Sequence, residues 1–253
     1  MRLVILGCGT STGVPVIGCH CEVCASANPL NKRTRSSLLV QVNGKNILID
    51  TSTDLRSQSL ANGVESIDAV LYTHPHADHI HGIDELRAFN LAAGGAAIPC
   101  FGGEHTIERI RTMFDYIFRE DGRDGWKPNL TTNIIRSPFD LFGEKIVPVE
   151  VMHGQTAIYG YRIGDMAYIT DCSAIPEGTL PVLRGVKILI LGALRQKPHP
   201  THFSITEAIA ASQAISAHRT VFTHLSHNVD YARDNPALPP GIEFAFDGMA
   251  LEV

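Results

Sequence analysis

Four potential metal-binding side chains follow directly on an apolar, strand-like segment at 69–73: His74, His76, Asp78 and His79. On an extended backbone, residues two apart point the same way, so His74 and His76 can hold one cation together. Asp78 and His79 fall in the turn into a helix and diverge from the first pair. They can therefore serve a second cation, about 3.5–4 Å away as in two-metal sites. The motif predicts a two-metal site at the end of a β-strand.

Segments with the patterns of strands and helices alternate along the rest of the chain. Asn43 and Gly44 supply the positive φ angles of a tight hairpin turn, and Ser204 and Glu207 form a capping box at a helix start. This order predicts one α/β domain over residues 1–253, an αββα sandwich of two mixed β-sheets flanked by helices, with a strand pair at the end. Strands are expected at 2–6, 37–42, 46–50, 69–73, 146–152, 159–163, 167–170, 186–191, 220–222 and 242–253, and helices near 54–62, 83–92, 105–118 and 205–217.

Charge and the N-terminal sequence limit the partners. A formal charge of −5 argues against a protein that holds a long nucleic acid by its phosphates, so we expect no stable nucleic-acid complex. The apolar run at residues 3–6 is too short for a signal peptide or a membrane span. We therefore expect a cytoplasmic protein without a membrane partner, and a homodimer is possible.

Three of the six cysteines lie close together, as Cys19, Cys21 and Cys24. In a reducing compartment, this spacing indicates metal ligation rather than disulfides. Structural zinc requires four tetrahedral nitrogen or sulfur ligands, so a fourth must come from elsewhere. His227 is the best candidate, whereas His20 lies between two ligands and has little reach. The segment 18–35 is thus a predicted structural zinc loop.

Three more potential ligands each stand where a predicted strand ends: His153, Asp171 and His224. With the motif at 74–79, they resemble the signature of the metallo-β-lactamase superfamily. The resemblance implies that one catalytic metal is bound by His74, His76 and His153, that the other is bound by Asp78, His79 and His224, and that Asp171 bridges them. Imidazoles and carboxylates without a thiolate suit zinc or manganese.

Within that superfamily, the chain resembles the PhnP-type phosphodiesterase group. The matching segments are the opening 7–15, the cysteine loop, the motif at 74–79, the tail 223–227 and the closing 246–249. The resemblance implies hydrolysis of small or cyclic phosphodiesters, of the phosphoribosyl 1,2-cyclic phosphate type. The chain departs from the group in an insert at 104–133, which includes Arg119, Glu120, Asp121, Arg123 and Trp126 and leaves the substrate open.

Charge supports the same class of substrate. The four positive charges of two divalent cations exceed the two negative charges of Asp78 and Asp171. A bridging hydroxide, the expected nucleophile, cancels one more positive charge. The charge that remains favours a monoanion such as a phosphodiester. Asp78 and His202 are the predicted catalytic residues. His202 lies just before the capped helix, and its position resembles that of the proposed general acid in phosphodiesterase members of the superfamily, which implies that it protonates the leaving oxygen. His199 is the nearby competitor for this role, and the alternative is that His202 only caps or packs.

Three other functions remain open. The first is a tRNA 3′-end nuclease of the same fold, which the acidic net charge disfavours. The second is a thioesterase of the glyoxalase II kind, for which the cysteine loop has no obvious use. A non-catalytic protein resembling PqqB ranks last, because that interpretation expects degraded ligands and all seven are present.

Overall fold

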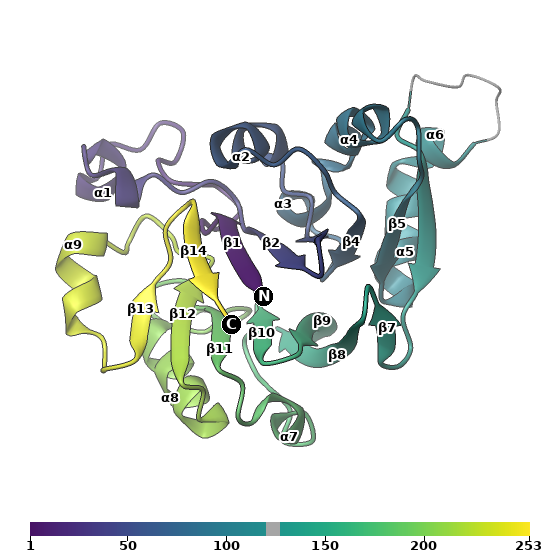
Figure 1. The fold of residues 1–253 in the computed structure, drawn as a ribbon. Coiled ribbons are helices and arrows are strands. Elements are labelled where there is room, and N and C mark those ends of the chain that lie inside the picture. Colours follow the sequence, from purple (N-terminus) through teal and green to yellow (C-terminus); the bar gives the residue numbers. More distant parts are fainter. Residues whose placement is uncertain (120–126) are drawn as a thin grey trace.

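The computed structural model describes residues 1–119 and 127–253, which form two seven-stranded β-sheets packed face to face with helices on the outside (Figure 1). The predicted αββα sandwich is confirmed. The first sheet has the order β14-β1-β2-β3-β4-β5-β6, and the second has the order β13-β12-β11-β10-β9-β8-β7. Among the described residues, no helix is long and apolar enough to cross a membrane.

Both sheets mix parallel and antiparallel pairs. In the first sheet, the strands from β3 to β6 are parallel and the other pairs are antiparallel. In the second, the strands from β10 to β13 are parallel. The bounds of the first sheet are β1 Arg2–Gly7, β2 Ser37–Val42, β3 Lys45–Ile49, β4 Ala69–Tyr72, β5 Ile98–Gly102, β6 Leu130–Ile134 and β14 Met249–Glu252. Those of the second are β7 Phe139–Leu141, β8 Glu144–His153, β9 Thr156–Ile163, β10 Met166–Ile169, β11 Ile188–Gly192, β12 Arg219–Thr223 and β13 Ile242–Phe244.

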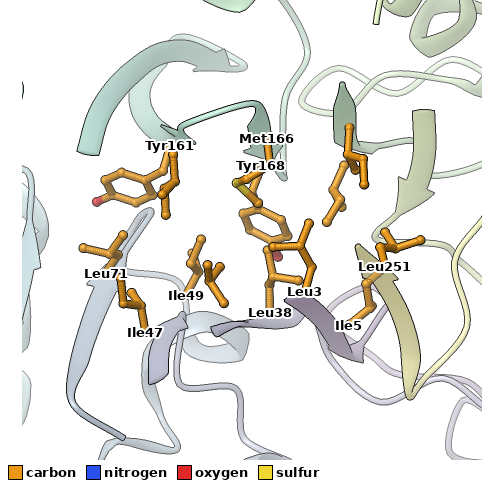
Figure 2. Packing of buried hydrophobic residues seen from close by; sticks show 14 of the residues in the cluster. Leu3, Ile5, Leu38, Ile47, Ile49, Leu71, Tyr161, Met166, Tyr168 and Leu251 are labelled. Atoms are coloured by element: carbon orange, nitrogen blue, oxygen red, sulfur yellow. The ribbon is translucent and has the colours of Figure 1, made fainter. Parts of the chain in front are cut away.

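Apolar side chains fill the space between the two sheets, with Leu38, Ile49 and Leu71 from one face meeting Tyr161 and Tyr168 from the other (Figure 2). Two further buried clusters lie under the outer helices. The helices are α1 Glu22–Ala25, α2 Leu55–Asn62, α3 Ala77–Ile80, α4 Leu86–Ala92, α5 Glu104–Met113, α6 Asp115–Phe118, α7 Leu180–Leu183, α8 Ile205–Ile215 and α9 Tyr231–Asp234, with short 3-10 turns at Pro29–Asn31, Ile83–Glu85 and Asn235–Ala237.

Two local predictions are confirmed by the backbone. Asn43 and Gly44 both have positive φ, at 50° and 72°, and join β2 to its antiparallel partner β3. The side chain of Ser204 accepts a hydrogen bond from the backbone of Glu207, and the Glu207 carboxylate accepts one from the backbone of Ser204. The capping box therefore sets the start of α8, directly after His202.

The predicted strand pair at 242–253 is wrong. β13 pairs with β12 in the second sheet, whereas β14 pairs with β1 in the first sheet. The chain crosses between the sheets over 245–248, where Ala245 N–H donates to the Phe222 carbonyl and Gly248 N–H donates to the Ile5 carbonyl. The two segments therefore close different sheets instead of forming a hairpin.

The segment 104–133 contains α5, α6 and the start of β6. The expected helix over 105–118 divides near Phe114, which caps α5 and precedes α6. Glu120, Asp121, Arg123 and Trp126 lie outside the described residues. That this segment is an insert, and that 18–35 is a zinc loop within a single domain, stay predictions.

Candidate dinuclear metal centre

The candidate site lies at one rim of the sandwich, where strands of both sheets end. The 74–79 motif follows β4 of the first sheet. In the second sheet, His153 ends β8, and Asp171 and His224 follow β10 and β12. Asp171 and His224 adopt the left-handed conformation, with φ of 52° and 59°. Outside glycine such a backbone costs about 1–3 kcal/mol at each position, so it persists only where the surrounding structure enforces it.

The first ligand group consists of His74, His76, His153 and Asp171, whose candidate ligand atoms all lie within 4.8 Å of one another. Nε2 of His74 is 3.1 Å from Nδ1 of His76 and 3.8 Å from Oδ2 of Asp171. Nδ1 of His153 lies 2.8 Å from the Thr201 carbonyl, which can only accept a hydrogen bond. Nδ1 therefore carries a proton, and in the neutral ring Nε2 is the nitrogen available to bind a cation.

The second ligand group consists of Asp78, His79, Asp171 and His224, with the same 4.8 Å limit between ligand atoms. Oδ1 of Asp171 is 3.3 Å from Nε2 of His79 and 3.1 Å from Nδ1 of His224. The other carboxylate oxygen of Asp171 faces the first group. A single carboxylate thus faces both groups, which is the arrangement that a bridging ligand requires.

Two polar atoms in the second group are buried without a hydrogen-bond partner among the described residues. These atoms are Oδ2 of Asp78 and Nε2 of His79, 3.2 Å apart. Buried polar atoms are nearly always paired, because an unpaired one costs about 1–3 kcal/mol. A divalent cation at this point would accept both lone pairs. The donor set of imidazoles and carboxylates fits zinc or manganese equally well.

Asp50 is a functional residue that the sequence analysis missed. It follows β3 with a φ of 64°, is fully buried, and places Oδ2 2.7 Å from Nδ1 of His79. It also accepts hydrogen bonds from the backbone and hydroxyl groups of Thr73, both at 2.8 Å. A carboxylate on the outer nitrogen fixes the ring of a metal-binding histidine. The signal in the sequence was an aspartate directly after the buried strand 45–49.

Thr10 supports His224 in a similar way. Its hydroxyl lies 3.1 Å from Nε2 of His224, while Nδ1 of that ring faces Asp171. Thr10 belongs to the opening segment 7–15, in which the sequence pattern alone does not distinguish a turn residue from one that supports the site. The structure thus gives that segment a place beside the second group.

Negative charge is concentrated around His79. Burial by itself would lower the pKa of His79, but the carboxylates of Asp171, Asp78 and Asp50 raise it well above its usual value. Burial would raise the pKa of Asp171, but the rings of His224 and His79 hold it well below its usual range. Three buried carboxylates around one imidazole require positive charge, and a divalent cation supplies more of it than one proton does.

His202 lies beside both ligand groups without belonging to either. Its ring stacks on His224 at a centroid distance of 4.9 Å and lies 4.8 Å from the ring of His153. Nδ1 is 3.9 Å from Oδ2 of Asp171, and His199 lies farther out, 5.1 Å from His202 between ring centroids. Burial, followed by the nearby His224, lowers the pKa of His202 to about 3. A phosphate anion against the ring would raise the pKa again, because it stabilises the imidazolium.

The cysteine loop and His227 form a third candidate metal group. Nδ1 of His227 lies 3.3, 3.5 and 3.6 Å from the sulfur atoms of Cys19, Cys21 and Cys24. Tetrahedral zinc with ordinary Zn–S and Zn–N bonds separates sulfur from nitrogen by about 3.6 Å. The backbone N–H of Cys24 donates to the Cys21 sulfur and lowers the pKa of that thiol to about 6. Burial raises the pKa of the Cys24 thiol instead. The four residues therefore have the spacing that a closed zinc site needs, and Cys21 has the thiolate character.

A cavity of about 400 Å³ opens beside the first ligand group. His74, His76 and His153 form its inner end. One wall comes from Gly103 and the first turns of α5, with Glu104, His105, Thr106 and Arg109. The opposite wall comes from Glu150 of β8 and from Thr156, Ala157, Ile158 and Tyr159 of β9. A cavity of this size accommodates a small organic ligand next to the candidate metals.

Comparison with known proteins agrees with this geometry. The model of the β-lactamase superfamily domain matches residues 45–225. A solved structure described as a new diphosphatase from the PhnP family superimposes with a TM-score of 0.93 at 44% identity, covering 100% of this chain and 97% of that one.

Two curated relatives are also similar over most of this chain. Octanoyltransferase of Porphyromonas gingivalis is 39% identical over 254 residues, which cover 98% of this chain and 51% of that protein, so this chain spans about half of its length. Coenzyme PQQ synthesis protein B of Methylobacterium radiotolerans is 36% identical over 222 residues, covering 75% of this chain and 72% of that protein.

Proposed function

Because this chain belongs to the metallo-β-lactamase superfamily and is PhnP-like, we propose that it is a dinuclear-metal phosphodiesterase that hydrolyses small or cyclic phosphodiesters. The observation that carries the proposal is the pair of ligand groups that share Asp171, with a cavity for a small organic ligand beside the first group. The 44% identical structure described as a diphosphatase supports phosphorus chemistry.

The proposed cofactors are two zinc or manganese ions in the catalytic site and one structural zinc ion in the cysteine loop. His74, His76 and His153 would bind the first ion, Asp78, His79 and His224 the second, and Asp171 both. Four positive charges exceed the three negative charges of Asp78, Asp171 and the neighbouring Asp50, which leaves a cationic site that attracts a phosphodiester anion. When bound, such a pair of cations generates a nucleophile from water at neutral pH and stabilises charge on the phosphate oxygens.

The chain's own residues would orient the metal-binding histidines and supply a proton to the leaving oxygen. Asp50 and Thr10 hold the rings of His79 and His224 in place through their outer nitrogens. His202, stacked on His224 and mostly shielded from solvent, faces the site and is proposed to donate a proton to the leaving oxygen. The negative charge of the bound phosphate favours the protonated form of His202, which is the form that this role requires.

Replacement of His202 by alanine separates this role from metal binding. An alkoxide is a poor leaving group that needs a proton, whereas nitrophenolate leaves without one. His202→Ala should therefore lower turnover of a cyclic ribose ester by about 10²-fold or more, but turnover of a nitrophenyl ester much less. Steady-state kinetics on both substrates, with metal content measured on the same samples, tests this. Equal losses on the two esters would contradict a proton-donating role.

The alternative functions receive less support. The net charge of −5 disfavours a tRNA nuclease that holds a long polyanion. The name octanoyltransferase belongs to a protein about twice the length of this chain, so the name does not support acyl transfer by this chain. A non-catalytic role would leave the proposed ligands of both groups without a use.

A substrate panel tests the proposed function. Protein reconstituted with zinc or manganese is incubated with bis(p-nitrophenyl) phosphate, ribose 1,2-cyclic phosphate, a precursor tRNA and a glutathione thioester. We expect turnover of the two small phosphodiesters, abolished by a chelator and restored by added metal. Turnover of the thioester alone would overturn the proposal, and cleavage of tRNA alone would favour the nuclease.

A further inference from the structure

Thr73 lies between β4 and the 74–79 motif, and its side chain touches two residues of the candidate centre. The hydroxyl oxygen is 2.8 Å from Oδ2 of Asp50 and 3.0 Å from Nδ1 of His74. All three side chains are buried, so water does not compete for these contacts. Asp50 also holds the ring of His79. One buried hydroxyl thus joins a ligand of the first group to the carboxylate that supports a ligand of the second.

The proton of this hydroxyl has a defined place. Three donors converge on Asp50, namely Nδ1 of His79 and the backbone and hydroxyl groups of Thr73. An ionised carboxylate only accepts hydrogen bonds, so Thr73 donates its single hydroxyl proton to Asp50. The Thr73 oxygen is left to accept, and the donor that faces it is Nδ1 of His74. A neutral imidazole carries one proton, so Nε2 of His74 keeps a free lone pair.

That lone pair lies where the first cation would bind. Nε2 of His74 is 3.1 Å from Nδ1 of His76 and 3.8 Å from Oδ2 of Asp171. Both neighbouring atoms can accept a hydrogen bond, so they would favour a proton on Nε2 if the Thr73 hydroxyl were absent. A cation could then bind only after that proton had left. The Thr73 hydroxyl opposes this by holding the proton on the other side of the ring.

We infer that Thr73 is a positioning residue that keeps His74 in its Nδ1–H tautomer and so prepares the first ligand group for a cation. The inference rests on the metal pair of the proposed function but not on the substrate. Asp50 then serves both groups, His79 directly and His74 through Thr73. Partners of this kind typically change metal affinity by about 10–100-fold.

Nitrogen-15 NMR of the metal-free protein tests the tautomer directly, at a pH where the ring is neutral. The His74 signals are assigned by their absence in His74→Gln. The wild type should carry the proton on Nδ1, and Thr73→Val, which keeps the side-chain shape without the hydroxyl, should shift it toward Nε2. Thr73→Ser should retain the wild-type tautomer. A wild-type ring protonated at Nε2 would overturn the inference by itself, even if Thr73→Val failed to fold, and so would an unchanged tautomer in Thr73→Val.

Zinc titration of the metal-free protein measures the consequence for binding. Thr73→Val should weaken one of the two catalytic positions by about 10–100-fold, whereas Thr73→Ser should bind zinc as the wild type does. Thr220→Val is the matched control, because Thr220 is as buried as Thr73, at 1% exposed, and its hydroxyl pairs with Ser212 instead of a ligand. An unchanged affinity in Thr73→Val, or an equal loss in Thr220→Val, would contradict the positioning role.

These measurements separate the inference from the proposed function, because neither requires turnover. If no phosphodiester is hydrolysed but Thr73→Val moves the proton and weakens zinc binding, the positioning role stands and the proposed function fails. If phosphodiesters are hydrolysed and Thr73→Val leaves the tautomer unchanged, the proposed function stands and the positioning role fails.

Discussion

Three residues around the candidate metal centre share an unusual backbone conformation. Asp50, Asp171 and His224 follow strands β3, β10 and β12 with φ between 52° and 64°. Aspartate and histidine are enriched several-fold in this conformation among non-glycine residues, although it still costs free energy at each position. Three of the six described non-glycine residues with positive φ thus lie at the candidate site.

Asp50 offers a test of how the site is supported. Asp50→Asn retains a hydrogen-bond acceptor for Nδ1 of His79 but removes the buried charge that raises the basicity of that ring. The affinity of the second metal position should fall by about 10–100-fold. Metal titration followed by calorimetry measures this, with Asp68→Asn as the control because Asp68 forms a surface ion pair with Lys45. An unchanged affinity in Asp50→Asn would show that Asp50 serves the fold alone.

At the residue scale, the sequence predicts most of the candidate site. The ligands at 74–79 are recognisable because four donors follow one strand, and His153, Asp171 and His224 because each ends a strand. Asp50 also stands at the end of a predicted strand, but the sequence does not show that its partner is His79, 29 residues further along the chain. Thr10 is a single polar residue whose partner lies at the far end of the chain. Only the packing of β3 beside β4, and of the opening segment beside Leu225 after β12, brings them to the histidines that they support.

At the scale of elements, the cysteine loop is tied to the segment that carries His224. His227 lies three residues after His224. The buried Arg33 donates to the carbonyl groups of Ser226 and Val229 from within the predicted loop at 18–35. Zinc bound to the loop cysteines and His227 would therefore restrain the 224–229 segment together with Arg33. Loss of this zinc would make the position of His224, a proposed catalytic ligand, less fixed.

Replacement of a loop cysteine tests the structural zinc. Cys21→Ser should lose one tightly bound zinc per chain and lower the midpoint of thermal unfolding, because binding of structural zinc contributes directly to folding. His20→Ala is the matched control, since His20 is exposed in the same loop and belongs to none of the candidate ligand groups. Metal analysis and thermal unfolding of both variants measure the zinc content and the midpoint. A wild-type zinc content that survives in Cys21→Ser would contradict a zinc site here.

The capping box of α8 gives a pH-dependent prediction. Hydrogen bonds from the Ser204 hydroxyl and backbone lower the pKa of Glu207 in the folded protein. The stability contributed by the ionised Glu207 is thus complete above its unfolded pKa of about 4.3 and is lost as pH falls through the lower folded pKa. Glu207→Ala should cost about 0.3–1.5 kcal/mol of unfolding free energy at pH 7, and less below pH 4. Urea unfolding of the variant and the wild type at pH 7 and below pH 4 measures this difference. Glu108→Ala, at an exposed position of α5, is the control. A cost of Glu207→Ala that grows on acidification would contradict the prediction.

Some elements could not be predicted from local sequence. β5 contains Pro99 and β6 consists mainly of polar residues, so neither has a clear strand pattern, yet parallel pairing places both in the first sheet. The segment 242–253 shows two strand-like stretches, but local sequence cannot tell that they join different sheets. Both features depend on contacts between distant parts of the chain.

At the scale of the whole molecule, the candidate centre lies where the two sheets meet. The first sheet contributes the motif after β4 and Asp50 after β3, while the second contributes His153, Asp171 and His224. Each ligand group therefore contains residues from both sheets. The termini also meet, since β1 and β14 are neighbours in the first sheet (Figure 1). The packing of one sheet on the other thus sets the geometry of the site.

The central claim is that two metal ions share Asp171, and metal content per chain tests it most directly. Asp171→Asn suits this test because asparagine tolerates the left-handed backbone, whereas its neutral amide cannot bridge two cations. Inductively coupled plasma measurements should give three metals for the wild type and one, the tightly bound zinc, for Asp171→Asn. Three metals retained in Asp171→Asn, or only one in the wild type, would contradict the account.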